Sequence, residues 1–112
     1  MRNGHSILEH VDRILSSREF LNSERMRRFL RFTVEQAIQG EGGCLKECLI
    51  GMQVFDRRPD YNPRIDPIVR VEARRLRSKL EKYYGSEGRL DPVRIEYPKG
   101  GYAPVFRESH SE

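Results

Sequence analysis

The segment from Asp66 to Leu80, DPIVRVEARRLRSKL, constrains the fold of this chain more than any other. When the residues are placed 100° apart, apolar side chains fall within about 40° of one direction: Val69, Ala73, Leu76, Leu80 and Tyr83. The opposite side is mostly basic: Arg70, Val71, Arg74, Arg75, Ser78 and Lys82. The pattern predicts one amphipathic helix that buries an apolar stripe and presents arginines to solvent.

Positive charge is concentrated in and around this helix. The segment from Arg64 to Tyr84 contains seven Lys or Arg residues and three Asp or Glu residues, so its formal net charge is +4. The formal net charge of the whole chain is also +4. The rest of the chain is therefore close to neutral. Localised positive charge is typical of proteins that bind polyanions, although a solvated helix surface produces the same pattern.

Two helices are predicted ahead of this segment. Residues 6–16 have apolar residues at helical spacing (Ile7, Leu8, Val11, Ile14 and Leu15), with Ser6 as the expected N-cap and Glu9 completing a capping box. Residues 24–39 carry a second stripe, with Ser23 as the expected cap and the glycines from Gly40 as the stop. Phe20 and Leu21, between these helices, are expected to pack on the core.

A shorter helix and a hairpin complete the predicted elements. Residues 45–55 have helical periodicity, and Gly51 within them indicates a close crossing of another helix. Asp66 is expected to cap the basic helix, which runs to about Tyr84 and stops at Gly85. Residues 93–97 and 102–106 are expected to pair as strands around a tight Gly100-Gly101 turn, with Pro104 confining the second strand to an edge.

The motifs resemble those of OmpR/PhoB-type winged helix-turn-helix DNA-binding domains. Arg74–Leu80 (RRLRSKL) is similar to the R-R-L-R-x-K-L run of that family's recognition helix, and residues 69–73 fit where the family has V-D-V-H-I. Ile95–Tyr102 (IEYPKGGY) is similar to the wing pattern I-x-T-V-R-G-x-G-Y. Residues 45–55 fall where the first helix of the helix-turn-helix lies. The similarity covers roughly residues 24–106, and it extends to the N-terminal winged-helix module of some bacterial signalling proteins.

The fold expected from this resemblance is mainly α with a C-terminal β-hairpin, a winged helix-turn-helix with an extra N-terminal helix. Residues 1–22 are expected to form a helical extension that packs on the core, 23–106 the winged-helix domain and 107–112 a flexible tail. The extension is a departure, because the family usually has a small antiparallel sheet there.

The resemblance implies sequence-specific binding of double-stranded DNA by a bacterial transcription regulator. Helix 66–84 would lie in the major groove and the wing, 93–106, at the minor groove or backbone. Guanidinium groups match guanine O6 and N7, so base contacts are expected from Arg70, Arg74 and Arg75. Contacts to the backbone or minor groove are expected from Arg64, Arg77, Ser78, Lys82 and Lys99. For Arg77, an ion pair with Glu81 is the alternative. Ile95, Tyr97 and Tyr102 are expected to pack in the core or wing.

The alternative function is a winged-helix module for protein interaction or oligomerisation without DNA binding, and RNA is a further possible ligand. In that case Ile7, Leu8, Val11 and Leu15 are the expected dimer seam, and a homodimer through this helix is compatible with DNA binding too.

An enzyme is not indicated, because the chain has no P-loop, nucleophile elbow or metal-ligand pattern. No cofactor, metal or small-molecule substrate is expected. Cys44 and Cys48 are interpreted as reduced structural residues on one helix face. No apolar stretch approaches ~18 residues, so we expect a cytoplasmic, nucleoid-associated protein.

Overall fold

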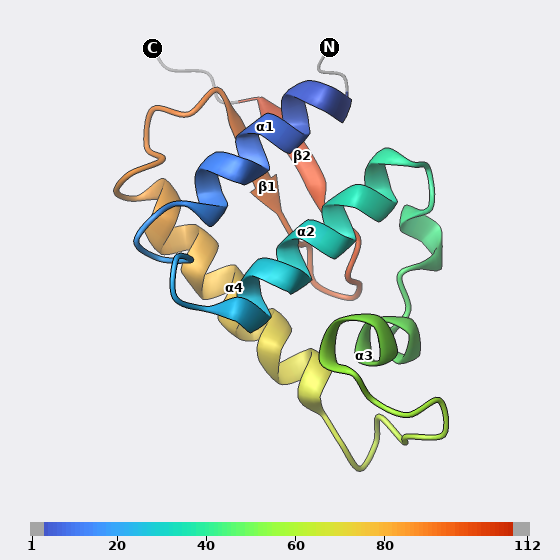
Figure 1. Cartoon of the computed structure of the whole chain (residues 1–112). Coiled ribbons are helices and arrows are strands. Elements are labelled where there is room, and N and C mark those ends of the chain that lie inside the picture. Colours follow the sequence, from blue (N-terminus) through green and yellow to red (C-terminus); the bar gives the residue numbers. More distant parts are fainter. Residues whose placement is uncertain (1–3, 109–112) are drawn as a thin grey trace.

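The computed structural model describes residues 4–108 (Figure 1). Its elements follow one another along the chain as α1 (Gly4–Leu15), α2 (Glu24–Ile38), the short 3-10 helix η1 (Gly42–Cys44), α3 (Glu47–Phe55), α4 (Ile68–Tyr84), β1 (Val93–Glu96) and β2 (Val105–Glu108). The two strands form an antiparallel sheet. The expected mainly helical chain with a C-terminal hairpin is therefore confirmed.

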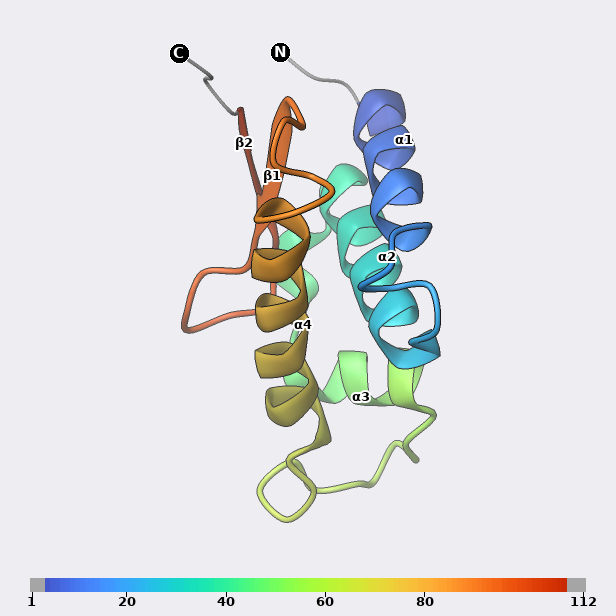
Figure 2. The same ribbon diagram turned by 90° about the vertical axis from the view of Figure 1, so that its left-hand side faces the viewer.

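The core lies between two groups of elements. In Figure 2, α1 and α2 lie on one side, α4 and the hairpin on the other, and α3 crosses the end of the molecule near the start of α4. Phe20 and Phe29 are fully buried in this core. All five residues of the stripe predicted for α4 are buried, so the orientation expected for this helix is confirmed.

The apolar face of α1 belongs to this core. Ile7, Val11, Ile14 and Leu15 are buried against the rest of the chain, and Leu8 is partly buried. Three of the four side chains of the expected dimer seam (Ile7, Val11 and Leu15) are therefore covered within the chain itself, and Leu8 is partly exposed. Of the two residues after α1, Phe20 packs on the core as expected, whereas Leu21 is exposed.

Gly51 makes room for a tyrosine and not for a crossing helix. A Cβ at this position would lie 2.0 Å from the hydroxyl oxygen of Tyr61, in the loop after α3. The Tyr61 hydroxyl donates a hydrogen bond to the Glu47 carbonyl at 2.9 Å. The close contact inferred from the glycine exists, but its partner is a loop side chain.

The helix ends differ from the predicted caps. α1 begins at Gly4, so Ser6 lies inside the helix, and Ser23 precedes α2 without a capping bond from its side chain. Pro67 occupies the cap position of α4, and Asp66 instead accepts a hydrogen bond from Arg57 Nε at 2.6 Å. The glycine stop after α2 is confirmed, since Gly40 has a φ of 82°.

The hairpin has a longer connection than the sequence indicated. Glu96 pairs with Val105, so residues 97–104 form a loop in place of a tight turn, and β2 starts three residues later than expected. Pro104 is buried just before β2 and lies outside it. β2 includes Arg107 and Glu108, so these residues are not part of a tail; residues 109–112 lie outside the described part of the chain.

None of the helices within residues 4–108 is long and apolar enough to cross a membrane.

Candidate nucleic-acid interface

The basic face of α4 points to solvent over its whole length. The six residues predicted for this face, Arg70, Val71, Arg74, Arg75, Ser78 and Lys82, are all exposed. The buried stripe on the opposite side fixes the rotation of the helix about its axis. Because a helix rises about 1.5 Å per residue, the 17 residues of α4 span roughly 25 Å.

Arg70 lies on the edge of α4 that faces α3. Its Nη1 atom is 3.2 Å from Glu47 Oε2, and its Nη2 donates to the Pro63 carbonyl at 3.1 Å. These partners come from the start of α3 and from the loop before α4. The guanidinium remains about half exposed, at 48%, so it is directed by neighbours while still accessible.

Arg77 holds the loop of residues 97–104, called the wing loop here after its predicted role, against α4. Its Nε donates to the Tyr97 carbonyl at 2.9 Å, and its Nη2 lies 3.5 Å from the Pro98 carbonyl and 3.4 Å from the Gly101 carbonyl. The alternative pairing with Glu81 is therefore wrong, because the guanidinium points toward the loop. Three carbonyl partners on one loop make Arg77 the link that sets the position of residues 97–104 relative to the helix.

A groove runs between α4 and the wing loop. It is lined by Glu47, Arg70, Ala73, Arg74, Arg77, Gly100, Gly101 and Tyr102. Arg74 is exposed and has no ion-pair partner among residues 4–108. Burial and the nearby Glu47 carboxylate raise the pKa of Tyr102 above its ordinary value, which keeps its hydroxyl protonated and able to donate a hydrogen bond. Tyr102 is partly buried against the core, and Ile95 and Tyr97 are buried, as expected.

The opposite edge of α4 faces α2. Here Arg75 is paired with Glu72 of the preceding turn, and Arg25 of α2 reaches the same carboxylate; both separations are 3.5 Å. Periodicity assigned neither Glu72 nor Arg25 to the site. The sequence does contain a signal for Glu72. It lies at helical spacing between Val69 and Leu76, so it is a charged residue at the border of the stripe that is predicted to be buried.

The remaining predicted contacts lie at the periphery of this surface. Arg64 is exposed in the loop before α4, Lys82 is exposed in the last turn, and Lys99 is exposed in the wing loop. Gly100 follows Lys99 with a φ of 93°, a backbone conformation that favours glycine. These cations flank the arginine row of α4 at its two ends and on its wing side.

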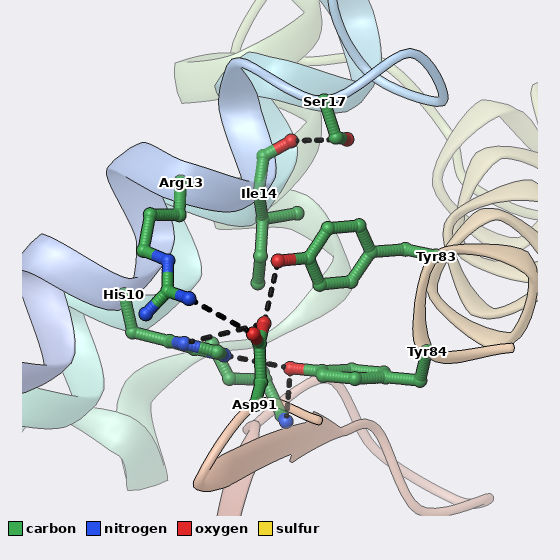
Figure 3. Close-up of polar contacts among 8 residues, drawn as sticks. His10, Arg13, Ile14, Ser17, Tyr83, Tyr84 and Asp91 are labelled. Atoms are coloured by element: carbon green, nitrogen blue, oxygen red, sulfur yellow. Dashed lines mark hydrogen bonds and ion pairs between the residues drawn. The ribbon is translucent and has the colours of Figure 1, made fainter. Parts of the chain in front are cut away.

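A buried polar cluster fastens α1 to the end of α4 (Figure 3). His10 Nε2 lies 3.0 Å from the Tyr84 hydroxyl, and its Nδ1 is 3.8 Å from Asp91 Oδ2. Asp91 also accepts hydrogen bonds from Tyr83 at 2.5 Å and from Arg13 at 3.1 Å. Sequence reasoning missed this cluster, because its members come from three separate segments and show no pattern within any of them.

The cluster also reaches strand β1 of the hairpin. The backbone N–H of Ile95 in β1 donates to the Tyr84 hydroxyl at 2.9 Å, and the Arg94 guanidinium lies 4.8 Å from the centre of the Tyr84 ring. Burial raises the pKa of both Tyr83 and Tyr84 well above the ordinary value. Their hydroxyls therefore stay protonated. The hydrogen bonds of these hydroxyls connect α1, α4 and β1 on the buried side of α4.

Metal chemistry has no candidate site in the part of the chain that the structure describes, where no group of three or more His, Cys, Asp or Glu residues could hold an ion. Cys44 ends η1 and Cys48 lies in α3, so the expected shared helix face is wrong. Cys48 is exposed as a free thiol. His10 is buried.

Comparison of the chain with protein-family models, with curated proteins and with solved structures finds no match.

Proposed function

We propose that this chain is a winged helix-turn-helix domain that binds double-stranded DNA in a sequence-specific manner and serves in transcription regulation. α3 and α4 are the two helices of the helix-turn-helix, α4 enters the major groove, and the hairpin 93–106, with the loop 97–104 at its tip, is the wing at the minor groove or backbone. The observation that carries the proposal is the row of exposed arginines on α4, with the wing loop held beside it by Arg77.

The dimensions of α4 suit a major groove. A helix with its side chains is about 10–12 Å across, and the major groove of B-DNA is about 12 Å wide. Arg70, Arg74 and Arg75 lie on the side that would meet the base edges, and a guanidinium can donate two parallel hydrogen bonds to guanine. Each such contact discriminates between base pairs by about 1–3 kcal/mol.

The flanking cations suit the sugar-phosphate backbone. Arg64, Lys82 and Lys99 are exposed around the arginine row, Ser78 adds a hydroxyl donor on the same face, and Arg77 brings the wing close to α4. Phosphate contacts of this kind fix the register of a protein on the duplex without reading its sequence. Base reading and positioning are thereby divided between the centre and the periphery of one surface.

Docking of a protein through α1 is less well supported. Ile7, Val11 and Leu15 of the predicted seam are buried in the core of the chain and Leu8 is partly buried, and the exposed residues of α1 among those described are polar. The basic face of α4, by contrast, lies next to the loop 97–104, in which Gly100 and Gly101 are exposed. Glycines without side chains allow the DNA backbone to approach this loop closely.

Selection of bound sequences from a random pool of duplex DNA, followed by anisotropy measurements with the selected duplex, tests the proposal. A selected consensus is expected, with affinity that falls steeply with salt. Three exposed cations at phosphates (Arg64, Lys82 and Lys99) predict a slope of roughly −2.7 in log K against log salt, or about a fortyfold loss between roughly 50 and 200 mM. Arg77 is not counted, because its guanidinium is hydrogen-bonded to the loop 97–104. Binding that is independent of salt, or selection without a consensus, would reject sequence-specific DNA binding.

A further inference from the structure

Glu72 is an almost fully buried carboxylate beneath the exposed face of α4. Its side chain is 3% exposed, although it comes from the helix that carries the basic face. Each of its oxygens lies 3.5 Å from a different arginine: Oε2 from Arg25 Nη1 on α2, and Oε1 from Arg75 Nη1 on α4. A buried carboxylate requires such cations, because it has lost most of its hydration.

The two arginines differ from their shared partner in exposure. The side chains of Arg25 and Arg75 are 60% and 70% exposed, so the carboxylate lies inside the molecule and both guanidinium groups lie at its surface. Glu72 Oε1 accepts no hydrogen bond within residues 4–108. The attraction therefore directs the Arg75 guanidinium without occupying its N–H groups in a short bond.

We propose that Glu72 is a positioning residue, which orients Arg75 for base reading and brings Arg25 of α2 into the set of DNA contacts. The inference rests on the proposed function. It assigns the edge of α4 that faces α2 to the interface, opposite the edge that faces the wing, so that the duplex would be held from both sides of α4.

Two physical arguments favour a positioning role over a role in stability. An arginine side chain loses rotamer freedom when it binds, and a carboxylate behind it lowers the number of conformations to be lost. A buried ion pair is also weak evidence for stability, because its desolvation offsets its attraction. Removal of the Glu72 charge leaves two arginines that are already solvated, so the fold has little to lose.

Glu72→Gln distinguishes the positioning role from a role in stability. The substitution removes a carboxylate that would repel nearby phosphates, and it also removes the charge that orients Arg75. Its removal is expected to raise the affinity for the scrambled duplex two- to fivefold and, since Arg75 is no longer directed, to lower the preference for the selected sequence at least fivefold. The affinity for the scrambled duplex is therefore expected to rise while the preference for the selected sequence falls. A merely structural defect would lower both affinities together.

Glu81→Gln is the matched control. Glu81 lies on the same helix, is exposed and has no ion-pair partner in the described part of the chain, so its loss removes the same charge without releasing an arginine. It is expected to raise both affinities and leave their ratio unchanged. Arg25→Ala is expected to weaken binding to both duplexes by a similar factor and to reduce the salt slope by about one.

The experiment measures anisotropy of the selected duplex and of a scrambled duplex at the same salt concentration, for the parent and the three variants. Thermal unfolding is measured alongside, and Glu72→Met, which fills a similar volume, replaces Glu72→Gln if the latter does not fold. A preference equal to that of the parent in the Glu72 variant would overturn the positioning role. A parent that shows no salt-dependent binding to either duplex would reject the proposed function itself, before any variant is compared.

Discussion

At the scale of single residues, Arg77 shows how the structure changes the role that a motif suggests. The sequence places it within the RRLRSKL run, among residues of similar charge. In the structure its neighbours on the helix, Arg74 and Arg75, are exposed, whereas Arg77 is half-buried and donates to carbonyls of the wing loop. A side chain 80° from the centre of the apolar stripe lies at its border, where periodicity alone does not distinguish contact with solvent from contact with the next element.

Arg77→Ala is expected to lower the free energy of unfolding by about 1 kcal/mol, which is less than the roughly 1.5–3 kcal/mol of a hydrogen bond to a charged group because the site is partly exposed. Urea titration measures this change. Arg74→Ala is the matched control, since Arg74 has no ion-pair partner within residues 4–108, and it is expected to leave the urea midpoint unchanged. Equal midpoints for the two variants would show that Arg77 does not hold the wing.

At the scale of elements, the helices and the presence of a C-terminal hairpin could be predicted, but the register of the hairpin and the length of its loop could not. Helical periodicity is local, and it gave α2 and α4 to within one or two residues. The register of β1 and β2 depends on the eight-residue loop between them, which is held by Arg77 and by the buried Tyr97. The caps failed for a related reason: Asp66 is bonded to Arg57, a partner that the sequence around the helix start does not indicate.

The packing of α1 in the core predicts that truncation of one of its apolar side chains destabilises the fold. Ile14 is fully buried, so Ile14→Ala is expected to lower the free energy of unfolding by about 2–4 kcal/mol, from lost transfer energy and the cavity that remains. Urea titration measures the loss, and sedimentation reports the oligomeric state. Retained stability with a changed oligomeric state would instead assign α1 to a subunit interface.

At the scale of the whole molecule, buried tyrosines connect the helices to the hairpin. Tyr84 joins α1 to β1 through His10 and Ile95. Tyr97, just after β1, has its hydroxyl 2.6 Å from that of Thr33 on α2. The exposed face of α4 could be predicted because it depends on the sequence of one helix. The tyrosine contacts on the buried side of α4 could not be predicted, because they join residues up to 74 positions apart in the chain.

These tyrosines predict a loss of stability at alkaline pH. Burial raises the pKa of Tyr83, Tyr84 and Tyr97 above the ordinary value of 10.0. Above about pH 10 the unfolded chain releases protons that the folded chain keeps, so the free energy of unfolding falls as pH rises, by up to about 1.4 kcal/mol per pH unit for each group. Below that range the contribution is fully present.

Urea titrations at a series of pH values between about 8 and 11 test this dependence. Tyr97→Phe removes one of the three groups, and its decline is expected to be shallower than that of the parent. The same slope in parent and variant would show that the Tyr97 hydroxyl ionises as readily in the folded chain as in the unfolded one.

The central claim, that the exposed arginines of α4 read duplex DNA, is tested most directly by the double variant Arg74→Ala, Arg75→Ala. Anisotropy of the selected and scrambled duplexes is measured at one salt concentration, with circular dichroism as the control for folding. We expect an unchanged circular dichroism spectrum and nearly equal, weakened affinities for the two duplexes. A folded double variant that still prefers the selected duplex as strongly as the parent does would contradict it.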